Sequence, residues 1–263
     1  MMGTPMIDTE QLILFTFLFL RIGAMLIMIP VIGERNVPLR VKGCLAILLS
    51  LLLLPTVQIK LPALPSASEA EIFVLAVAMC SEAFIGIVIG FAAKIIFSGI
   101  QFAGQMIGIQ IGFSIVNVID PMSAAQVSVI SQFQYLVAML IYLAVDAHHI
   151  FIIAIADSYR VVAPFAYHFS GSLMQQILIL SKELFVTAIK ISAPVMAVLF
   201  FTNVALGVVA RTVPQINIFI VGFPLQIAVG LTILGFMSPF FASVIQGMLT
   251  GTQTVVNVLL QLM

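Results

Sequence analysis

The sequence predicts an all-α integral membrane protein, and its composition is the first observation that indicates this class. Of 263 residues, 62% are hydrophobic and only 8% are charged, whereas a soluble domain carries about 25% charged residues. The mean hydropathy is +1.26. Too little polar surface is therefore available to cover a soluble globule.

The second and third observations are the length of the apolar segments and the shortness of the polar breaks between them. A helix needs about 20 apolar residues to cross the hydrocarbon core of a bilayer. Six segments come close to this length: Leu12–Ile32, Cys44–Val57, Ile72–Phe97, Val127–Ala156, Leu184–Ala210 and Ile216–Ile245. Short breaks favour helical hairpins within one domain. Pro194, Pro224 and Pro239 lie inside the last two segments and predict kinks.

Charge and motif content exclude several classes of function. The formal net charge at pH 7 is zero, and the chain has no basic run. Nucleic-acid binding therefore lacks electrostatic support. No HExxH, GxSxG or phosphate-binding glycine loop is present, so we expect no enzyme activity and no cofactor. The break at 33–42 contains Arg35, Arg40 and Lys42, which favours a cytoplasmic location for it. The other breaks carry too few cations to determine the topology.

Several ionisable residues lie within or near apolar segments. They are Arg21, Glu82, Lys94, Asp146 and Lys190. Each costs at least about 2.5 kcal/mol inside a membrane, so each needs a partner or a water-filled path. One interpretation is structural ion pairing within or between subunits. The other is a small ion-coupled transporter that uses Glu82, Lys94 and Lys190 as coupling residues. Glu82 and Lys94 are too far apart in sequence to pair along one helix.

Two adjacent histidines, His148 and His149, follow Asp146 in the stretch "VDAHHIF". Adjacent side chains on a helix project about 100° apart, so the two imidazoles are not expected to share a metal ion. Capping of a helix end or a location at the membrane interface is the favoured interpretation.

Three glycines, Gly104, Gly108 and Gly112, share one face of a predicted helix because they are spaced four residues apart. Three interpretations remain open: close packing against another helix, a pore-lining or gating element, and a broken transporter helix. The residues alone favour packing over gating.

Five stretches in order resemble the flagellar biosynthetic FliR family of type III secretion export-gate proteins. They are "RIGAMLIMIPVIGERNVPLRVK", "SEAFIGIVIGFAAKIIF", "AGQMIGIQIGFSIVNVIDP", "VDAHHIFI" and "AIKISAPVMAVLFFTNVALGVVARTVPQINIFIVGFPLQIAVG". The last stretch, with Pro214-Gln215-Ile216-Asn217 and Gly222-Phe223-Pro224, is the most similar to the family.

The resemblance implies a non-catalytic core subunit of the flagellar export gate. Such a subunit would assemble with FliP and FliQ in the bacterial inner membrane, at the flagellar basal body, with FlhB around the base. Unfolded flagellar subunits would cross the membrane through the resulting channel, and parts of the chain would project to the periplasmic side. The resemblance also implies one domain over 1–263, with N-terminal helices in 1–183 and a FliQ-like hairpin in 184–263.

By this resemblance, the segment near 104–121 contains a loop that helps to close the pore. Its expected residues are Gly104, Gly108, Gly112, Ser114, Ile115, Val116, Asn117 and Val118. The family often carries phenylalanine where this chain has Ile115 and Val118, and an acidic residue where it has Gln105.

A second set of residues is expected to contact other subunits. The set is Arg35, Arg40, Lys42, Glu82, Lys94, Lys190, Arg211, Pro214, Gln215, Asn217 and Pro224.

Overall fold

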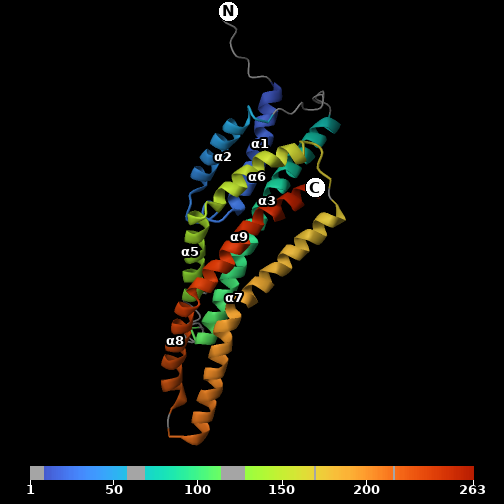
Figure 1. The fold of residues 1–263 in the computed structure, drawn as a ribbon. Helices are drawn as coiled ribbons and strands as arrows, with labels where there is room; N and C mark the ends of the chain where they lie inside the picture. The colour runs from blue at the N-terminus through green and yellow to red at the C-terminus, as the bar shows by residue number, and fades with distance from the viewer. Residues whose placement is uncertain (1–8, 58–68, 114–127, 169, 216) are drawn as a thin grey trace, which may run out of the picture. The chain divides into compact units, whose positions relative to one another are not determined.

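The computed structural model describes residues 9–57, 69–113, 128–168, 170–215 and 217–263 (Figure 1). All regular structure in these ranges is α-helical, which confirms the predicted all-α class. The helices are α1 (Thr9–Met28), α2 (Leu39–Leu53), α3 (Glu69–Ile111), α5 (Val129–Ala144), α6 (Ala147–Val161), α7 (Gly171–Thr212), α8 (Ile218–Phe236) and α9 (Ser238–Gln261).

The helix boundaries differ from the six predicted segments at several points. The fourth and sixth segments are each divided into two helices, α5 with α6 and α8 with α9. The first break contains Asp146, whose backbone is left-handed with a φ of 53°. The second break is at Met237. Pro239 follows in the first turn of α9, a position where a helix tolerates proline. Pro194 and Pro224 lie inside helices that stay continuous.

Gly104 and Gly108 lie in the C-terminal part of α3, a continuous helix of 43 residues. The predicted third segment ended near Phe97, because polar Ser98 and Gln101 lower the hydropathy beyond it. Helix α7 is similarly long, with 42 residues.

Three helices of the described part are long and apolar enough to cross a membrane, in the ranges Glu10–Met28, Ile72–Ile111 and Gly171–Thr212. The number rises to five if α5 with α6 and α8 with α9 each count as one span. The structure therefore supports a membrane protein with between three and five candidate spans.

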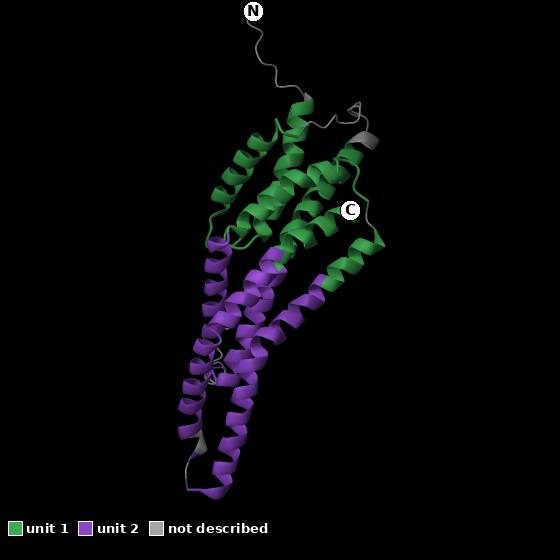
Figure 2. Cartoon of the chain, in the orientation of Figure 1, with its two compact units in different colours: residues 1–94, 146–179, 251–263 green, residues 95–145, 180–250 purple. Residues whose placement is uncertain are grey.

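The chain divides into two compact units (Figure 2). Unit 1 contains residues 1–94, 146–179 and 251–263, and unit 2 contains residues 95–145 and 180–250. Helices α3 and α7 therefore contribute to both units. Each unit gathers segments that are far apart in sequence. The expected division into 1–183 and a FliQ-like 184–263 stays a prediction.

Unit 1 packs α1 closely against the first half of α3. Phe17, Leu18 and Ile22 of α1 are fully buried. After α1 the chain turns through Val31, which has a φ of 72°, an unusual backbone conformation for a β-branched residue. Lys42 of α2 stabilises this turn, because its ammonium group donates hydrogen bonds of 2.9 Å to the carbonyl oxygens of Gly33 and Glu34.

Unit 2 has an aliphatic core around the C-terminal end of α3. The buried members come from α3, α5 and α7: Ile107, Ile111, Ile130, Val195 and Leu199. Residues of α8, including Ile227 and Ile233, pack against them. This core holds the C-terminal end of α3 in a defined position.

Candidate functional site

The glycine face of α3 packs directly against the start of α5. A β-carbon added to Gly104 would collide with the backbone Cα of Ser131. One added to Gly108 would meet the hydroxyl oxygen of Ser128, with the Ser128 β-carbon 2.9 Å away. Glycine is therefore required at both positions for this close approach of the two helices. The packing interpretation of Gly104 and Gly108 is confirmed.

Polar side chains of α5 line this contact. The Ser131 hydroxyl donates a hydrogen bond of 2.8 Å to the carbonyl oxygen of Gln101. The amide oxygen of Gln134 lies 2.8 Å from the place that a Gly104 β-carbon would occupy. A polar contact between helices in apolar surroundings fixes their register, because the hydroxyl would otherwise lack a partner.

Gly112 has a different role from the other two glycines, because it ends α3. Its φ is 101°, a conformation that favours glycine. The Phe113 amide donates to the Gly108 carbonyl and the Gly112 amide donates to the Ile109 carbonyl, both at 3.1 Å. These two bonds form the Schellman arrangement that terminates many helices. A β-carbon on Gly112 would lie 3.2 Å from the Phe223 ring of α8.

Residues 114–127 follow this helix end and lie outside the described residues. The expected plug residues Ser114, Ile115, Val116, Asn117 and Val118 belong to this segment, so their role stays a prediction. What the structure establishes is the anchor before them, where Gly112 lies against Phe223.

A buried ion pair joins α1 to α3 inside unit 1. Arg21 Nε lies 2.7 Å from Glu82 Oε2, and the two side chains are 0% and 1% exposed. Arg21 Nη2 donates a second bond of 3.0 Å to Glu82 Oε1. This two-point geometry suits the planar guanidinium and the carboxylate.

Helix α6 completes the surroundings of Arg21. Arg21 Nη1 donates to the Ser158 hydroxyl at 2.9 Å, and Nη2 donates to the Val162 carbonyl at 3.2 Å. The Tyr159 ring lies 3.8 Å below the guanidinium carbon, a favourable cation–π distance. Every nitrogen of the guanidinium therefore has a partner. Its charge is compensated as burial in an apolar protein requires.

The pairing explains a sequence pattern that residue reasoning had not interpreted. Glu82, Gly86 and Gly90 are spaced four residues apart on α3, so they share one face. A β-carbon on Gly86 would collide with the Arg21 carbonyl oxygen, and one on Gly90 would lie 2.5 Å from the Met28 β-carbon. Two glycines thus let α1 approach closely enough for Arg21 to reach Glu82. This spacing was the signal that could have identified the pair.

The residues expected to contact other subunits differ in exposure. Glu82 is enclosed by its own chain, and Lys42 is half-buried at the turn that it stabilises. The others are exposed: Arg35, Arg40, Lys94, Lys190, Arg211, Pro214, Gln215, Asn217 and Pro224. Their proposed contacts stay predictions.

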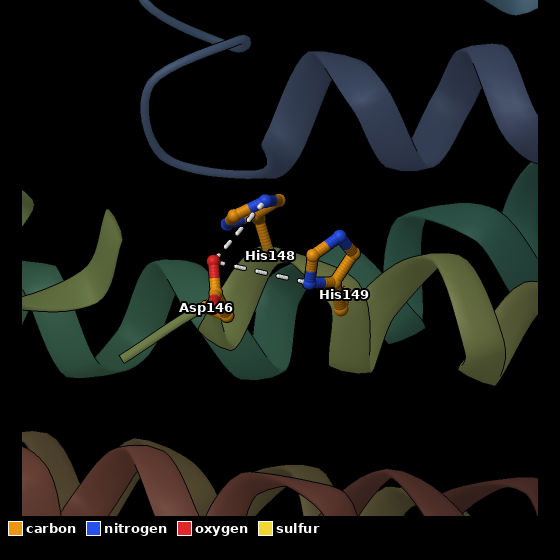
Figure 3. A group of neighbouring side chains, drawn as sticks. All are labelled: Asp146, His148 and His149. Carbon is orange, nitrogen blue, oxygen red and sulfur yellow. Dashed lines mark ion pairs between the residues drawn. The ribbon is translucent and has the colours of Figure 1, made fainter. Parts of the chain in front are cut away.

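Asp146, His148 and His149 lie close together at the start of α6 (Figure 3). Asp146 occupies the N-cap position, but its side chain makes no capping hydrogen bond. Of the two favoured interpretations, capping by this side chain is therefore not observed, and a location at the membrane interface stays a prediction. The two histidine rings lie 4.3 Å apart between centroids.

These features define a class of protein: a helical membrane protein whose helices are held together by glycine faces and a buried ion pair. Comparison with known proteins is consistent with this class. A family described as "Bacterial export proteins, family 1" matches residues 12–252. The chain therefore belongs to the bacterial export proteins of family 1.

Individual relatives agree with this assignment. The chain is 37% identical over 231 residues to the flagellar biosynthetic protein FliR of Bacillus subtilis, covering 84% of each chain. It is 30% identical to FliR of Pectobacterium carotovorum, covering 86% of this chain and 84% of the relative. It is 29% identical to FliR of Escherichia coli, covering 87% and 85%. The resemblance to the FliR family is confirmed.

Proposed function

We propose that the chain is a structural core subunit of the flagellar type III protein export gate. Together with FliP and FliQ it forms the channel through which unfolded flagellar subunits cross the bacterial inner membrane. FlhB contacts this assembly at the flagellar basal body. The role is not enzymatic, and some parts of the chain project to the periplasmic side. The family match over residues 12–252 carries this proposal.

The distribution of apolar side chains supports a role within a larger assembly. Helices α7 and α8 leave many large apolar residues uncovered by their own chain, among them Phe200, Phe201, Val208 and Ile220. Lipid or the apolar helices of other subunits can cover such faces. By contrast, the polar Arg21 and Glu82 are turned inward and satisfied. This distribution suits a subunit whose exposed apolar helix faces pack against neighbouring subunits.

The geometry at the end of α3 supports the pore-closing part of the proposal. The Schellman turn at Gly112 directs the chain out of the helix directly before the proposed plug residues 114–118. Gly112 is packed against Phe223, so the entry to the proposed loop has a fixed support. A fixed helix end directly before the proposed plug residues is an arrangement that a gate needs.

Co-purification tests the proposal. The chain, expressed with FliP and FliQ, is expected to purify as one stable complex. Phe201→Ala together with Ile220→Ala should weaken the complex, since both side chains are exposed in the isolated chain. Gln246→Ala, at an exposed polar position of α9, is the control and should leave the complex intact.

The alternative function, a small ion-coupled transporter, predicts the opposite outcome in these experiments. A transporter would be active alone in liposomes and would not need FliP and FliQ. Solute movement by the isolated chain, stopped by Lys94→Ala or Lys190→Ala, would overturn the export-gate proposal. Failure to co-purify with either partner would also overturn it.

A further inference from the structure

We propose that Asp146, His148 and His149 form a binding site for one divalent transition-metal ion at the start of α6 (Figure 3). The three residues are not part of the glycine face or of the buried ion pair. The proposal is therefore independent of the export-gate function.

The ligand atoms already converge in the structure. His148 Nε2 and His149 Nδ1 each lie 4.0 Å from Asp146 Oδ1. All three ligand atoms lie within 4.8 Å of one another. Figure 3 shows both imidazole rings turned toward the same carboxylate. The arrangement presents two nitrogen donors and one oxygen donor to a common point.

The backbone explains why adjacent histidines can converge here. The left-handed conformation of Asp146 places its side chain at the entrance to α6. The His149 amide then donates a 3.0 Å hydrogen bond to the Asp146 carbonyl, so Asp146 and His149 are three residues apart within one turn and share a face. The imidazole of His148 reaches the same carboxylate from the neighbouring direction. The separation of about 100° between adjacent helical side chains is thereby overcome by ring orientation.

The donor set fits a borderline transition metal. Two imidazoles and one carboxylate suit Zn²⁺ and related ions, whereas Mg²⁺ and Ca²⁺ prefer oxygen donors alone. Zinc–nitrogen bonds are about 2.0–2.1 Å long, so tetrahedral ligands lie about 3.3 Å apart. The three atoms must therefore approach by roughly 1 Å. Asp146 and His149 have exposed side chains, which can make this adjustment without disturbing a packed core.

The charge of Asp146 and the solvent access of the site are also compatible with Zn²⁺. The Asp146 carboxylate supplies a negative charge, which offsets the repulsion between a cation and the positive end of the α6 dipole. Three protein ligands leave at least one position for water or for a donor from another molecule. The site is thus an open, surface site rather than a closed structural one.

Zinc binding to the purified full-length chain tests the proposal. The chain contains three histidines in total, so a preparation without a polyhistidine tag offers few competing sites. We expect isothermal titration to show one Zn²⁺ bound per chain. His148→Ala, His149→Ala and Asp146→Asn should each weaken binding about tenfold or more. His168→Ala is the matched control, because it removes the remaining exposed histidine, and it should leave the affinity unchanged.

Cobalt provides a second, spectroscopic readout. Co²⁺ should give visible absorption bands of a nitrogen- and oxygen-ligated centre, and these bands should disappear in the His148→Ala chain. Circular dichroism of each variant confirms that its helices are intact. The absence of Zn²⁺ binding in the folded wild-type chain would overturn the proposal. An equal loss of affinity in the His168→Ala control would also overturn it.

Discussion

Arg21 of α1 holds Glu82 of α3 through two parallel hydrogen bonds of 2.7 and 3.0 Å. Because both side chains are enclosed by the chain, neither charge can be removed without leaving the other unpaired. The pair therefore fixes the register of α1 on α3. Its two hydrogen bonds also offset the cost of burying the two charges.

Glu82→Ala should lower the free energy of unfolding by about 3–5 kcal/mol, because it leaves the Arg21 charge buried and unpaired. Chemical unfolding of the purified chain in detergent measures this change. Arg160→Gln is the matched control. Arg160 pairs with Asp157 in the same unit, but its side chain is 83% exposed. The free energy of unfolding should therefore fall by less than about 1 kcal/mol.

The double variant Arg21→Met with Glu82→Met distinguishes a charge effect from a simple packing defect. It removes both charges and keeps apolar volume, so it should be more stable than Glu82→Ala. If the double variant is the less stable of the two, the ion-pair interpretation fails.

Gly104→Ala should destabilise the contact between α3 and α5, because the added methyl group would occupy the position of the Ser131 backbone. The free energy of unfolding should fall by about 1–3 kcal/mol, as it does when a core is overpacked. Gly247→Ala, in the interior of α9 with open space around the added carbon, is the control. It should stabilise the helix by up to about 1 kcal/mol. Equal stability of the two variants would argue against the packing role of Gly104.

The sequence predicted the helical class and the glycine face because both depend on local patterns. Apolar length and four-residue spacing can be read along one segment. The partners of the glycines could not be predicted, because Ser128 and Ser131 come from a different helix and no rule of spacing links them to Gly104. The Arg21–Glu82 pair has members 61 residues apart. Its only local signal is the four-residue spacing of Glu82, Gly86 and Gly90 on α3, which does not identify Arg21 as the partner.

Local backbone chemistry also limited the prediction of the histidine cluster. The expectation that the two imidazoles do not share a metal ion considered only the angle of about 100° between adjacent side chains of a helix. The left-handed backbone of Asp146 and the 4.0 Å distances from its carboxylate to both histidines are not part of that argument. Asp146 precedes no proline or glycine that would have indicated a helix break there. The close approach of Asp146, His148 and His149 therefore became visible only in three dimensions.

Deletion of residues 114–119 should make the assembled complex leak ions, since these residues are proposed to close the pore. Conductance of membranes that contain the complex with FliP and FliQ measures the leak. A deletion of the same length, residues 62–67, in the connection between α2 and α3 is the control and should leave the barrier closed. If the barrier is unchanged after deletion of 114–119, the plug role is wrong.

Tyr167 should make stability depend on pH in the alkaline range. It lies between α6 and α7 with its ring against Phe84 at 5.6 Å, and burial raises its pKa above the ordinary value of 10.0. The unfolded chain then loses the phenolic proton at a lower pH than the folded chain. Stability is fully retained below about pH 10 and falls as the pH rises toward the folded pKa.

Urea unfolding at several pH values around 10 measures this effect. Tyr167→Phe keeps the ring contact and removes the titrating group, so the variant should lose less stability between neutral and alkaline pH. An identical alkaline loss in both chains would exclude Tyr167 as a contributor.

The length of α3 has a consequence for how the protein is made in the cell. Its 43 residues, at a rise of about 1.5 Å each, follow a contour of about 64 Å, roughly twice the thickness of the hydrocarbon core. Apolar side chains near both of its ends are exposed, including Phe73 and Ile109. A helix of this length along the bilayer normal cannot have both ends in the hydrocarbon core. In the proposed assembly, other subunits cover the end that lipid leaves exposed. A newly synthesised chain made without them is therefore expected to be a substrate for membrane quality-control proteases.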